Sequence, residues 1–318
     1  MKVLITGVSG FLGTHLILNA SKFSDLEVFG SADRLFHPEI PFHKMIRTDL
    51  TDINNISKLI NEVKPDKIVN LVALTDVDMC EKNKELADRV NTGILRNILD
   101  VTGGGIPVLQ VSTDSVFDGE HGNYKEEDKP HPLNYYAESK LRAEEVLLKS
   151  DGEHIVLRIN IYGWDFSSRV TLLEWVLLNL LNRDEIRMFT DIYFNPVPAY
   201  FIAEVIFSLV KKGGRGIFHL GCDDKISKFE FGRCISEIFK LTPGLINPVT
   251  VSSGNLSAAR PKNPSLNNDK LKRYLNIEIP GIETGLKAVK KELPGFNGYF
   301  DKSKEIFKKL SEEKDGQV

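Results

Sequence analysis

The sequence predicts an α/β fold, a Rossmann-type doubly wound parallel sheet with a smaller C-terminal lobe. Three observations support this prediction. Short runs rich in β-branched residues alternate with helical patterns through the first half of the 318 residues, as they do in βαβ units. A glycine-rich turn directly follows the first of these runs. The regular alternation ends near Tyr162, where a differently built part of the chain begins.

The first half contains the strands and helices of the predicted sheet domain. A buried strand over residues 3–6 leads through the glycine turn into an amphipathic helix over 11–22. A helix capped by Thr51 or Asp52 is predicted over 51–63. The other strands are predicted over 27–30, a segment ending near 47–49, 67–71, 107–111 and 154–158, and the other helices over 84–102 and 134–149.

The second half has a looser pattern. Helices are predicted over 172–181, 199–212, 228–240 and 283–293, and strands over 186–189 and 216–220. Proline and asparagine gather between residues 245 and 268, which predicts an irregular segment, and the Lys- and Glu-rich tail from residue 302 predicts a fraying terminal helix. We therefore expect the sheet domain to span 1–163, with segments at about 190–222 returning to it. The lobe and the C-terminal helices would take up most of 164–318.

Composition excludes several classes of protein. Hydrophobic residues make up 42% of the chain and charged residues 27%, so a sizeable core can form. The net charge of −3 argues against nucleic-acid binding through bulk positive charge. No apolar run approaches the roughly 18 residues of a membrane span. The N-terminus lacks the apolar region of a signal peptide, so a cytoplasmic location is expected. Three widely spaced cysteines and seven histidines without HxxxH spacing predict no metal site.

The turn after the first strand carries Gly7, Gly10 and Gly13 in a GxxGxxG pattern. The first glycine permits the tight turn, the second lets backbone N–H groups approach a pyrophosphate, and the third lets the helix pack closely on the sheet. The phosphates would then lie at the positive end of the helix dipole. Because the pattern stands between a strand and a helix, it predicts a dinucleotide-binding site.

Residues after the second and third strands bear on the choice of dinucleotide. Asp33 lies where an acidic residue commonly accepts ribose hydroxyls, which favours NAD. Ser31 and Arg34 would instead accommodate a 2′-phosphate, so both NADP(H) and NAD(H) stay open. Asp49 either holds the adenine amino group or is a carboxylate at a helix N-terminus.

A second group of residues could carry proton chemistry. Tyr136 and Lys140 lie at positions i and i+4, on one face of a predicted helix. A nearby ammonium stabilises a phenolate and lowers the pKa of the phenol. Thr113 follows a predicted strand about 23 residues earlier, at the sheet edge where ligands bind. Its hydroxyl could orient a substrate carbonyl for hydride transfer.

These motifs resemble those of the extended short-chain dehydrogenase/reductases, and most closely the dTDP-4-dehydrorhamnose reductase family. Residues 69–78 resemble that family's INAAAYTAVD segment, and residues 111–119 resemble its STDYVFDG motif. Residues 126–140 resemble its ExDxxxPLNVYGxSK motif. The resemblance spans nearly the whole chain.

The resemblance implies an NAD(P)-binding Rossmann domain over 1–163, a substrate-binding lobe, and NAD(P)H-dependent reduction of the 4-keto group of a nucleotide-linked deoxysugar. It also implies a homodimer. Thr113 would polarise the carbonyl, Tyr136 would donate the proton, and Lys140 would tune Tyr136 and bind the nicotinamide ribose. The cofactor would contact Tyr136, Lys140 and a larger set: Gly7, Ser9, Gly10, Phe11, Leu12, Gly13, Asp33, Arg34, Asp49, Leu50, Val72, Ala73 and Leu74. The substrate would contact Thr75, Val77, Asp114, Asn160, Trp164 and Arg260.

Departures from the family fall on the substrate side. Ser115 replaces an aromatic residue, and the family's Trp over the sugar is missing after Asn160. Trp164 could substitute for it or could be a buried lobe residue, and Arg260 could bind a diphosphate or brace the irregular segment. The Asp114-Ser115 pair lacks the glutamate base of the 4,6-dehydratases. The alternatives are a nucleotide-sugar epimerase and a non-catalytic subunit resembling the regulatory subunit of methionine adenosyltransferase.

Overall fold

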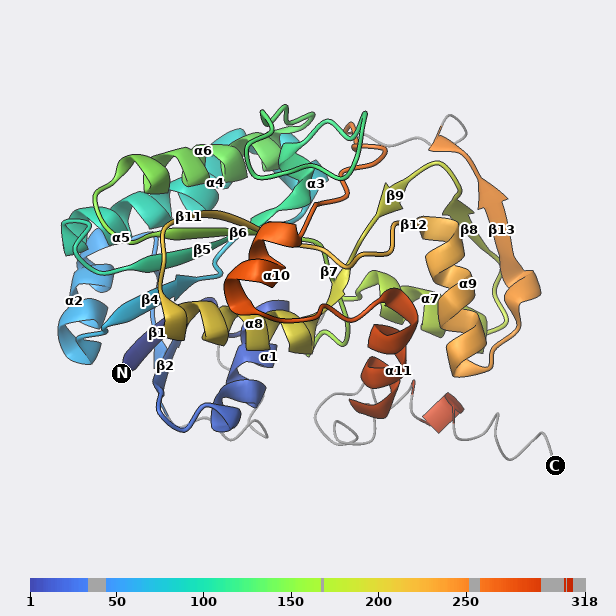
Figure 1. Ribbon diagram of the computed structural model, residues 1–318, viewed down its shortest axis with the longest axis horizontal. Helices are drawn as coiled ribbons and strands as arrows, with labels where there is room; N and C mark the ends of the chain where they lie inside the picture. The colour runs from blue at the N-terminus through green and yellow to red at the C-terminus, as the bar shows by residue number, and fades with distance from the viewer. Residues whose placement is uncertain (34–43, 167–168, 252–257, 293–305, 307, 311–318) are drawn as a thin grey trace.

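The computed structural model describes residues 1–33, 44–166, 169–251, 258–292, 306 and 308–310. Its centre is a seven-stranded sheet in the order β11-β6-β5-β4-β1-β2-β3, with every neighbouring pair parallel (Figure 1). The strands are β1 (Lys2–Thr6), β2 (Glu27–Ala32), β3 (Met45–Arg47), β4 (Lys67–Asn70), β5 (Val108–Thr113), β6 (Ile155–Ile159) and β11 (Gly216–Leu220). The predicted doubly wound sheet is confirmed, and the strand order reverses between β1 and β4.

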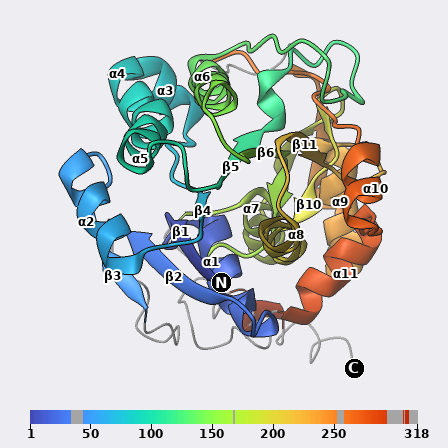
Figure 2. The same cartoon turned by 60° about the vertical axis from the view of Figure 1, so that its left-hand side comes forward.

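Helices cover both faces of the sheet, because successive side chains of a strand point to opposite faces (Figure 2). In β1, Val3 and Ile5 pack into one core layer, whereas Leu4 packs into the other. The first layer includes side chains of α1 (Phe11–Asn19), which η1 (Ala20–Lys22) extends, and of α8 (Ala199–Lys212). The second layer includes side chains of α2 (Ile53–Val63), α5 (Ile94–Thr102) and α6 (Tyr135–Lys149).

The lobe lies beyond the carboxyl ends of the sheet strands (Figure 1) and, among the described residues, is built of short strands and helices. Its helices are α7 (Leu172–Leu181), α9 (Lys228–Phe239) and α11 (Ile282–Glu292). Its strand pairs are β8 (Ile186–Phe189) with β13 (Ile246–Val249) and β9 (Tyr193–Phe194) with β12 (Ile226–Ser227), while β7 (Ile161–Tyr162) pairs with β10 (Val197–Pro198). Because β11 and α8 return to the sheet layers, the later chain interleaves with the earlier domain. The boundary at residue 163 stays a prediction.

The structure differs from the predicted secondary structure at several places, and part of the prediction lies outside the described residues. The expected irregular segment at 245–268 begins with η4 (Pro243–Leu245) and β13, which is held by its parallel pairing with β8. Two short helices, α3 (Val77–Lys82) and α10 (Asp269–Leu275), were not expected. The helix predicted over 84–102 is α4 (Lys84–Asp88), a π-helical turn η2 (Arg89–Gly93) and α5 in succession. Most of the tail from residue 302 lies outside the described residues.

Membrane insertion was not expected from the sequence. In the part of the chain that the structure describes, no helix has the length and apolar character needed to cross a bilayer.

Candidate active site

The glycine turn lies where the strand order reverses. Gly7 has a φ of 74°, a conformation that favours glycine, and its N–H donates to the carbonyl of Ser31 over 2.8 Å. A Cβ at Gly7 would lie 3.1 Å from the backbone nitrogen of Val72, so the ends of β1 and β4 approach closely. No side chain caps α1 at Gly10. Its first N–H groups, and the turn at Ser9, therefore form a cradle suited to phosphates.

Gly13 is needed for a different reason, the close packing of α1. A Cβ there would lie 2.4 Å from the carbonyl oxygen of Gly7 and 2.5 Å from the Cα of Val8. Both atoms belong to the backbone, so neither can move cheaply. The Phe11 and Leu12 side chains beside it are half-buried and buried.

We expect Gly13→Ala to lower the free energy of unfolding by about 1–3 kcal/mol or more, as overpacked positions do. Urea denaturation would measure the change. Gly93→Ala is the matched control, because its Cβ would meet nothing closer than the Asp88 carbonyl at 3.4 Å. There the helix should be unchanged or slightly more stable. Equal effects of the two substitutions would contradict this explanation.

The adenosine end of the site is only partly described. Asp33 is exposed, and its carbonyl accepts a hydrogen bond from Nε of Arg47 over 3.1 Å. Ser31 is fully buried, its carbonyl accepts from the N–H of Gly7, and its hydroxyl has no hydrogen-bond partner among the described residues. Arg34 lies outside the described residues. Arg47, at the end of β3, was not expected from the sequence.

Asp49 has local partners. Its carboxylate accepts from the backbone N–H of Thr51 over 2.9 Å and from the Thr51 hydroxyl over 2.7 Å. These hydrogen bonds hold the pKa of Asp49 below its usual value. The contacts favour the second of the two interpretations, a carboxylate in the turn that precedes α2. Leu50 beside it is buried.

The segment after β4 lies opposite the glycine turn and forms a second wall of the candidate site. Val72, Ala73 and Leu74 are half-buried. Both backbone polar groups of Leu74 bind the buried side chain of Asn91: the N–H donates to Oδ1 over 2.7 Å, and Nδ2 donates to the carbonyl over 3.2 Å. Nδ2 also donates to the Ser139 hydroxyl on α6 over 2.8 Å. Asn91 thus ties this wall to the helix that carries Tyr136 and Lys140.

Thr113, Tyr136 and Lys140 meet at the carboxyl end of β5. Asn134 caps α6 by accepting from the N–H of Ala137 over 3.0 Å, which starts the helix just before Tyr136. The Thr113 hydroxyl lies close enough to the phenol of Tyr136 to influence its pKa. Nζ of Lys140 donates to the carbonyl of Val111 in the same strand over 2.7 Å. The structure therefore brings together three residues that are up to 27 positions apart in the sequence.

Burial dominates the electrostatics of this group. It raises the pKa of Tyr136, and the nearby Thr113 hydroxyl opposes that rise only in part. That Lys140 tunes Tyr136 stays a prediction. Burial also lowers the pKa of Lys140 to about 8, while the charge of Glu144 acts in the opposite direction. Nζ of Lys140 lies against the Val111 carbonyl. A phenol that stays protonated is the form that can donate a proton.

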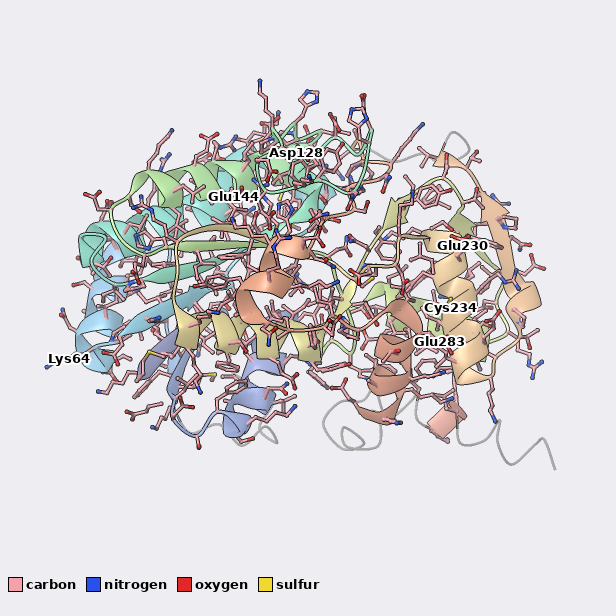
Figure 3. All side chains as sticks on the ribbon, in the orientation of Figure 1. Lys64, Asp128, Glu144, Glu230, Cys234 and Glu283 are labelled. Carbon is pink, nitrogen blue, oxygen red and sulfur yellow. The ribbon has the colours of Figure 1, made fainter. Side chains whose placement is uncertain are left out.

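Behind Lys140 lies a buried charged network that was not predicted from the sequence. Glu144, labelled on α6 in Figure 3, pairs with Arg158 of β6 at 2.6 Å, and both side chains are only 1% exposed. The Ser112 hydroxyl donates to Glu144, and Arg158 contacts the His219 ring at 3.2 Å. Burial lowers the pKa of His219 to about 3, so this ring is neutral. The network joins α6 to β5, β6 and β11.

The residues expected to bind substrate lie on the lobe side of Thr113. Asp114 is 2% exposed and accepts from the Thr113 hydroxyl over 3.1 Å and from Nδ2 of Asn160 over 2.5 Å. Thr75 is exposed and accepts from Nη1 of Arg169 in the lobe over 3.0 Å. Arg260 donates to Asp78 of α3 over 3.2 Å. Val77 is half-buried at the start of the same helix. Arg169 and Arg260, from later parts of the chain, thus contact the segment that follows β4.

Trp164 does not lie over this site. It is 1% exposed, its indole N–H donates to the carbonyl of Val289 over 2.8 Å, and its ring meets Phe239 edge-on. These contacts favour the alternative given from the sequence, a core residue of the lobe, and correct the expectation that Trp164 contacts the sugar. The physical reason is that Val289 of α11 accepts the indole hydrogen bond and Phe239 of α9 packs against the ring.

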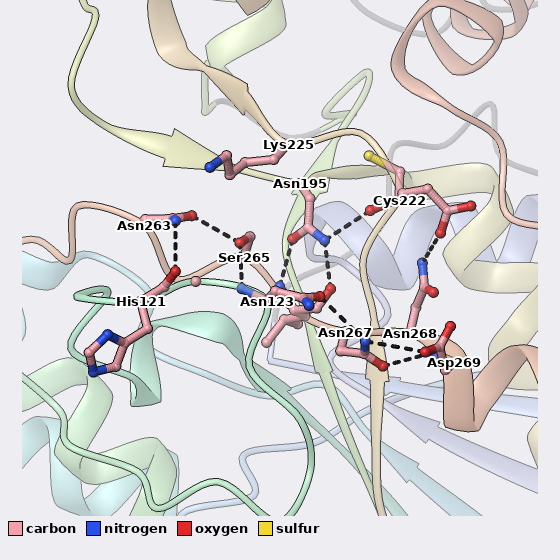
Figure 4. Close-up of a pocket in the computed structure, with 13 residues that line it drawn as sticks. His121, Asn123, Asn195, Cys222, Lys225, Asn263, Ser265, Asn267, Asn268 and Asp269 are labelled. Carbon is pink, nitrogen blue, oxygen red and sulfur yellow. Dashed lines mark hydrogen bonds between the residues drawn. The ribbon is translucent and has the colours of Figure 1, made fainter.

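A separate polar cavity of about 420 Å³ lies between residues 121–123 and 263–269 (Figure 4). None of the predicted site residues lines it. Nδ2 of Asn195 donates to the carbonyls of Cys222 and Leu266 over 2.9 and 2.8 Å. The amide groups there thus join three chain segments, and we assign no ligand to this cavity.

The sequence predicts neither a metal site nor a reactive thiol. Among the described residues no group of His, Cys, Asp and Glu is arranged to hold a metal ion. Burial raises the pKa of Cys80 to about 11, so its thiol is a poor nucleophile.

The glycine cradle, the post-strand Thr113 and the Tyr136–Lys140 helix define a dinucleotide-binding protein of the short-chain dehydrogenase/reductase class. A family model described as "RmlD substrate binding domain" matches residues 1–294, so the chain belongs to that family. The family resemblance stated from the sequence, to dTDP-4-dehydrorhamnose reductases, is thereby confirmed.

Three curated relatives are similar over most of their length. A "Probable low-salt glycan biosynthesis reductase Agl14" of Haloferax volcanii is 31% identical over 298 residues, covering 91% of this chain and 97% of the relative. A dTDP-4-dehydrorhamnose reductase of Sinorhizobium fredii is 28% identical and covers 91% and 96%. Methionine adenosyltransferase 2 subunit beta of Mus musculus is 27% identical and covers 90% and 86%.

A solved structure shows the same fold. The dTDP-4-dehydrorhamnose reductase of Bacillus anthracis, in complex with NADP, superimposes with a TM-score of 0.80 at 24% identity and covers 92% of this chain and 99% of its own.

Proposed function

We propose that this protein reduces the 4-keto group of a nucleotide-linked deoxysugar, with NADPH or NADH as the reductant. The observation that carries the proposal is the meeting of Thr113, Tyr136 and Lys140 beside a glycine cradle. Its substrate class follows the relatives that are named dTDP-4-dehydrorhamnose reductases.

The cofactor would fit the crevice between the ends of β1 and β4. The glycines leave a backbone cradle that a Cβ would partly fill at Gly7, and α1 has no side-chain cap that would compete with a phosphate. When bound, NADPH or NADH supplies the hydride that reduces the carbonyl carbon. Lys140 lies on the same helix face as Tyr136 and would bind the nicotinamide ribose.

The protein's own residues would handle the carbonyl oxygen. Thr113 would turn its hydroxyl from Asp114 to the carbonyl and polarise it. Tyr136 would donate its proton to the developing alkoxide, which completes an alcohol. Since burial raises the pKa of Tyr136, the phenol holds this proton at neutral pH. Arg169 and Arg260, which donate to Thr75 and Asp78, would bind the negative diphosphate of the nucleotide.

Purified protein should oxidise NADPH or NADH when dTDP-4-dehydrorhamnose is added, and loss of nicotinamide absorbance would measure the rate. Omission of the sugar is the control. An epimerase would instead interconvert nucleotide sugars without net consumption of cofactor. No turnover with either cofactor would contradict the proposed reductase.

A second candidate function is a non-catalytic regulatory subunit, which the similarity to methionine adenosyltransferase 2 subunit beta favours. Such a protein would bind NADPH without consuming it in the presence of any keto-sugar. Fluorescence titration of NADPH beside the turnover assay separates the two functions.

A further inference from the structure

The turn that carries Thr113 is too short to be stable by itself. Thr113 ends β5, and its hydroxyl accepts from the N–H of Ser115 over 3.1 Å, which caps the 3₁₀-helical turn η3 (Asp114–Val116). The N–H of Phe117 donates to the carbonyl of Asp114 over 3.1 Å and closes the turn. A single turn of this kind makes too few hydrogen bonds to fix its own conformation. Its geometry therefore depends on the residues that flank it.

Before the turn, Ser112 is held by the buried ion pair of Glu144 and Arg158. The Ser112 hydroxyl donates to Oε1 of Glu144. Nε of Arg158 donates to the same oxygen over 3.1 Å, and Nη2 donates to Oε2 over 2.6 Å. Two parallel hydrogen bonds fix the orientation of a carboxylate as well as its position. Arg158 thus determines where Glu144 holds the last strand residue before Thr113.

After the turn, Phe117 lies against the same guanidinium. Its ring centroid is 5.0 Å from Cζ of Arg158, which is a cation–π contact. The Phe117 ring is fully buried and stacks on Tyr124 at a centroid distance of 4.2 Å. Arg158 therefore acts on both ends of the turn, on one through Glu144 and on the other directly.

His219 fixes the remaining side of the guanidinium. Nδ1 of this ring lies 3.0 Å from the carbonyl of Tyr124, which can only accept, so Nδ1 carries the proton. Nε2 of the neutral ring then accepts from Nη1 of Arg158 over 3.2 Å. The Arg158 side chain is 1% exposed and has a protein partner for each of its three nitrogens and for one face. Its orientation is thus set on every side by the fold.

We propose that Arg158 is a positioning residue, which fixes the turn between Ser112 and Phe117 and thereby the place of the Thr113 hydroxyl beside the substrate carbonyl. Arg158 is buried and acts only through these neighbours. Its effect on catalysis rests on the proposed function, whereas its effect on the order of the turn does not. The two effects are therefore measured separately.

The test uses the double variant Glu144→Gln/Arg158→Met, which leaves no unpaired charge in the core. With dTDP-4-dehydrorhamnose, kcat should fall by about 10-fold to 100-fold, as it does when a catalytic group is displaced by a small distance. The affinity for NADPH should change little. Hydrogen exchange at the N–H groups of Ser115 and Phe117, followed by NMR, should become at least about 10-fold faster, because the turn opens more often.

Asp88→Asn/Arg142→Met is the matched control. Arg142 also pairs with a carboxylate, that of Asp88, and its Cζ also lies over an aromatic ring, 4.8 Å from the Tyr135 centroid. Its side chain is 35% exposed, however, and these partners belong to α4 and α6. In this variant kcat and the exchange at the turn should equal those of the wild type.

Amide groups of α8, in the other core layer from α6, report on the stability of the whole domain. Faster exchange confined to Ser115 and Phe117 supports the inference. Unchanged exchange there, or an equal acceleration there and in α8, would overturn it. An unchanged kcat in an active enzyme would overturn the effect on catalysis.

A smaller substitution serves if the double variant does not fold. Ser112→Ala removes only the hydroxyl that Glu144 holds, and it should speed exchange at the same two amides. Its control is Ser236→Ala, which removes an equally buried hydroxyl in α9 and should leave the turn unchanged. If wild-type protein reduces no keto-sugar, the proposed reductase fails, and hydrogen exchange alone decides on Arg158.

Discussion

Replacing Tyr136 with phenylalanine should lower kcat by about 100-fold to 10,000-fold, the range that a positioned proton donor contributes. The substitution removes one oxygen, the phenolic oxygen near the Thr113 hydroxyl. The ring and its packing stay in place, so the affinity for NADPH should change little. Steady-state kinetics and fluorescence titration would measure the two quantities.

The neighbouring tyrosine provides the control. Tyr135 precedes Tyr136 on α6, but its hydroxyl donates to Asp88 over 2.7 Å, away from Thr113. Tyr135→Phe also removes a single phenolic oxygen and should leave kcat near that of the wild type. If the two variants had similar kcat values, Tyr136 would not be the proton donor.

Arg158→Met should lower the free energy of unfolding by about 3–5 kcal/mol, the cost of leaving one charge of a buried pair without its partner. The remaining Glu144 carboxylate would be 1% exposed in contact with Ser112, with no guanidinium beside it. Urea denaturation would measure the loss. The double variant Glu144→Gln/Arg158→Met removes the unpaired charge and should recover much of the stability.

A surface ion pair that includes another arginine, Arg142 of α6, provides the comparison. Arg142 pairs with Asp88, and these side chains are 35% and 46% exposed. Arg142→Met should cost no more than about 1 kcal/mol, because exposed pairs are worth little. A cost of Arg158→Met as small as that of Arg142→Met would mean that the buried network does not stabilise the sheet domain.

Elements with strong local signals could be predicted closely from the sequence. The helix at 172–181 and the strand at 186–189 begin and end where their apolar patterns do. In contrast, β13 contains Asn247 and Pro248, residues that are typical of loops. It is a strand because β8 pairs with it, and that pairing joins residues about 60 positions apart.

In the candidate site, too, some features could be predicted from the sequence and others depend on contacts between distant segments. The order of Thr113, Tyr136 and Lys140 along the chain was sufficient to expect that they meet. The buried network could not be predicted, because Arg158 meets Glu144, and His219 meets Arg158, only when β5, β6 and β11 lie side by side. The pKa of Tyr136 depends on its burial, which no spacing in the sequence reports.

The π-helical turn at Arg89–Gly93 makes the helical segment from α4 to α5 sensitive to the insertion or deletion of single residues. A π-helical turn holds one residue more than an α-helical turn, and each residue rotates a helix by about 100°. Deleting one residue here would make the helix regular, but it would rotate the residues on one side of the deletion relative to those on the other. Either Asn91 would lose its hydrogen bonds to Leu74, or Ile94, Leu95 and Ile98 would no longer face the core. Substitutions along α4 and α5 alter one contact at a time, whereas a one-residue deletion would change the phase of the whole helix. In evolution, we therefore expect this helix to vary in sequence far more readily than in length.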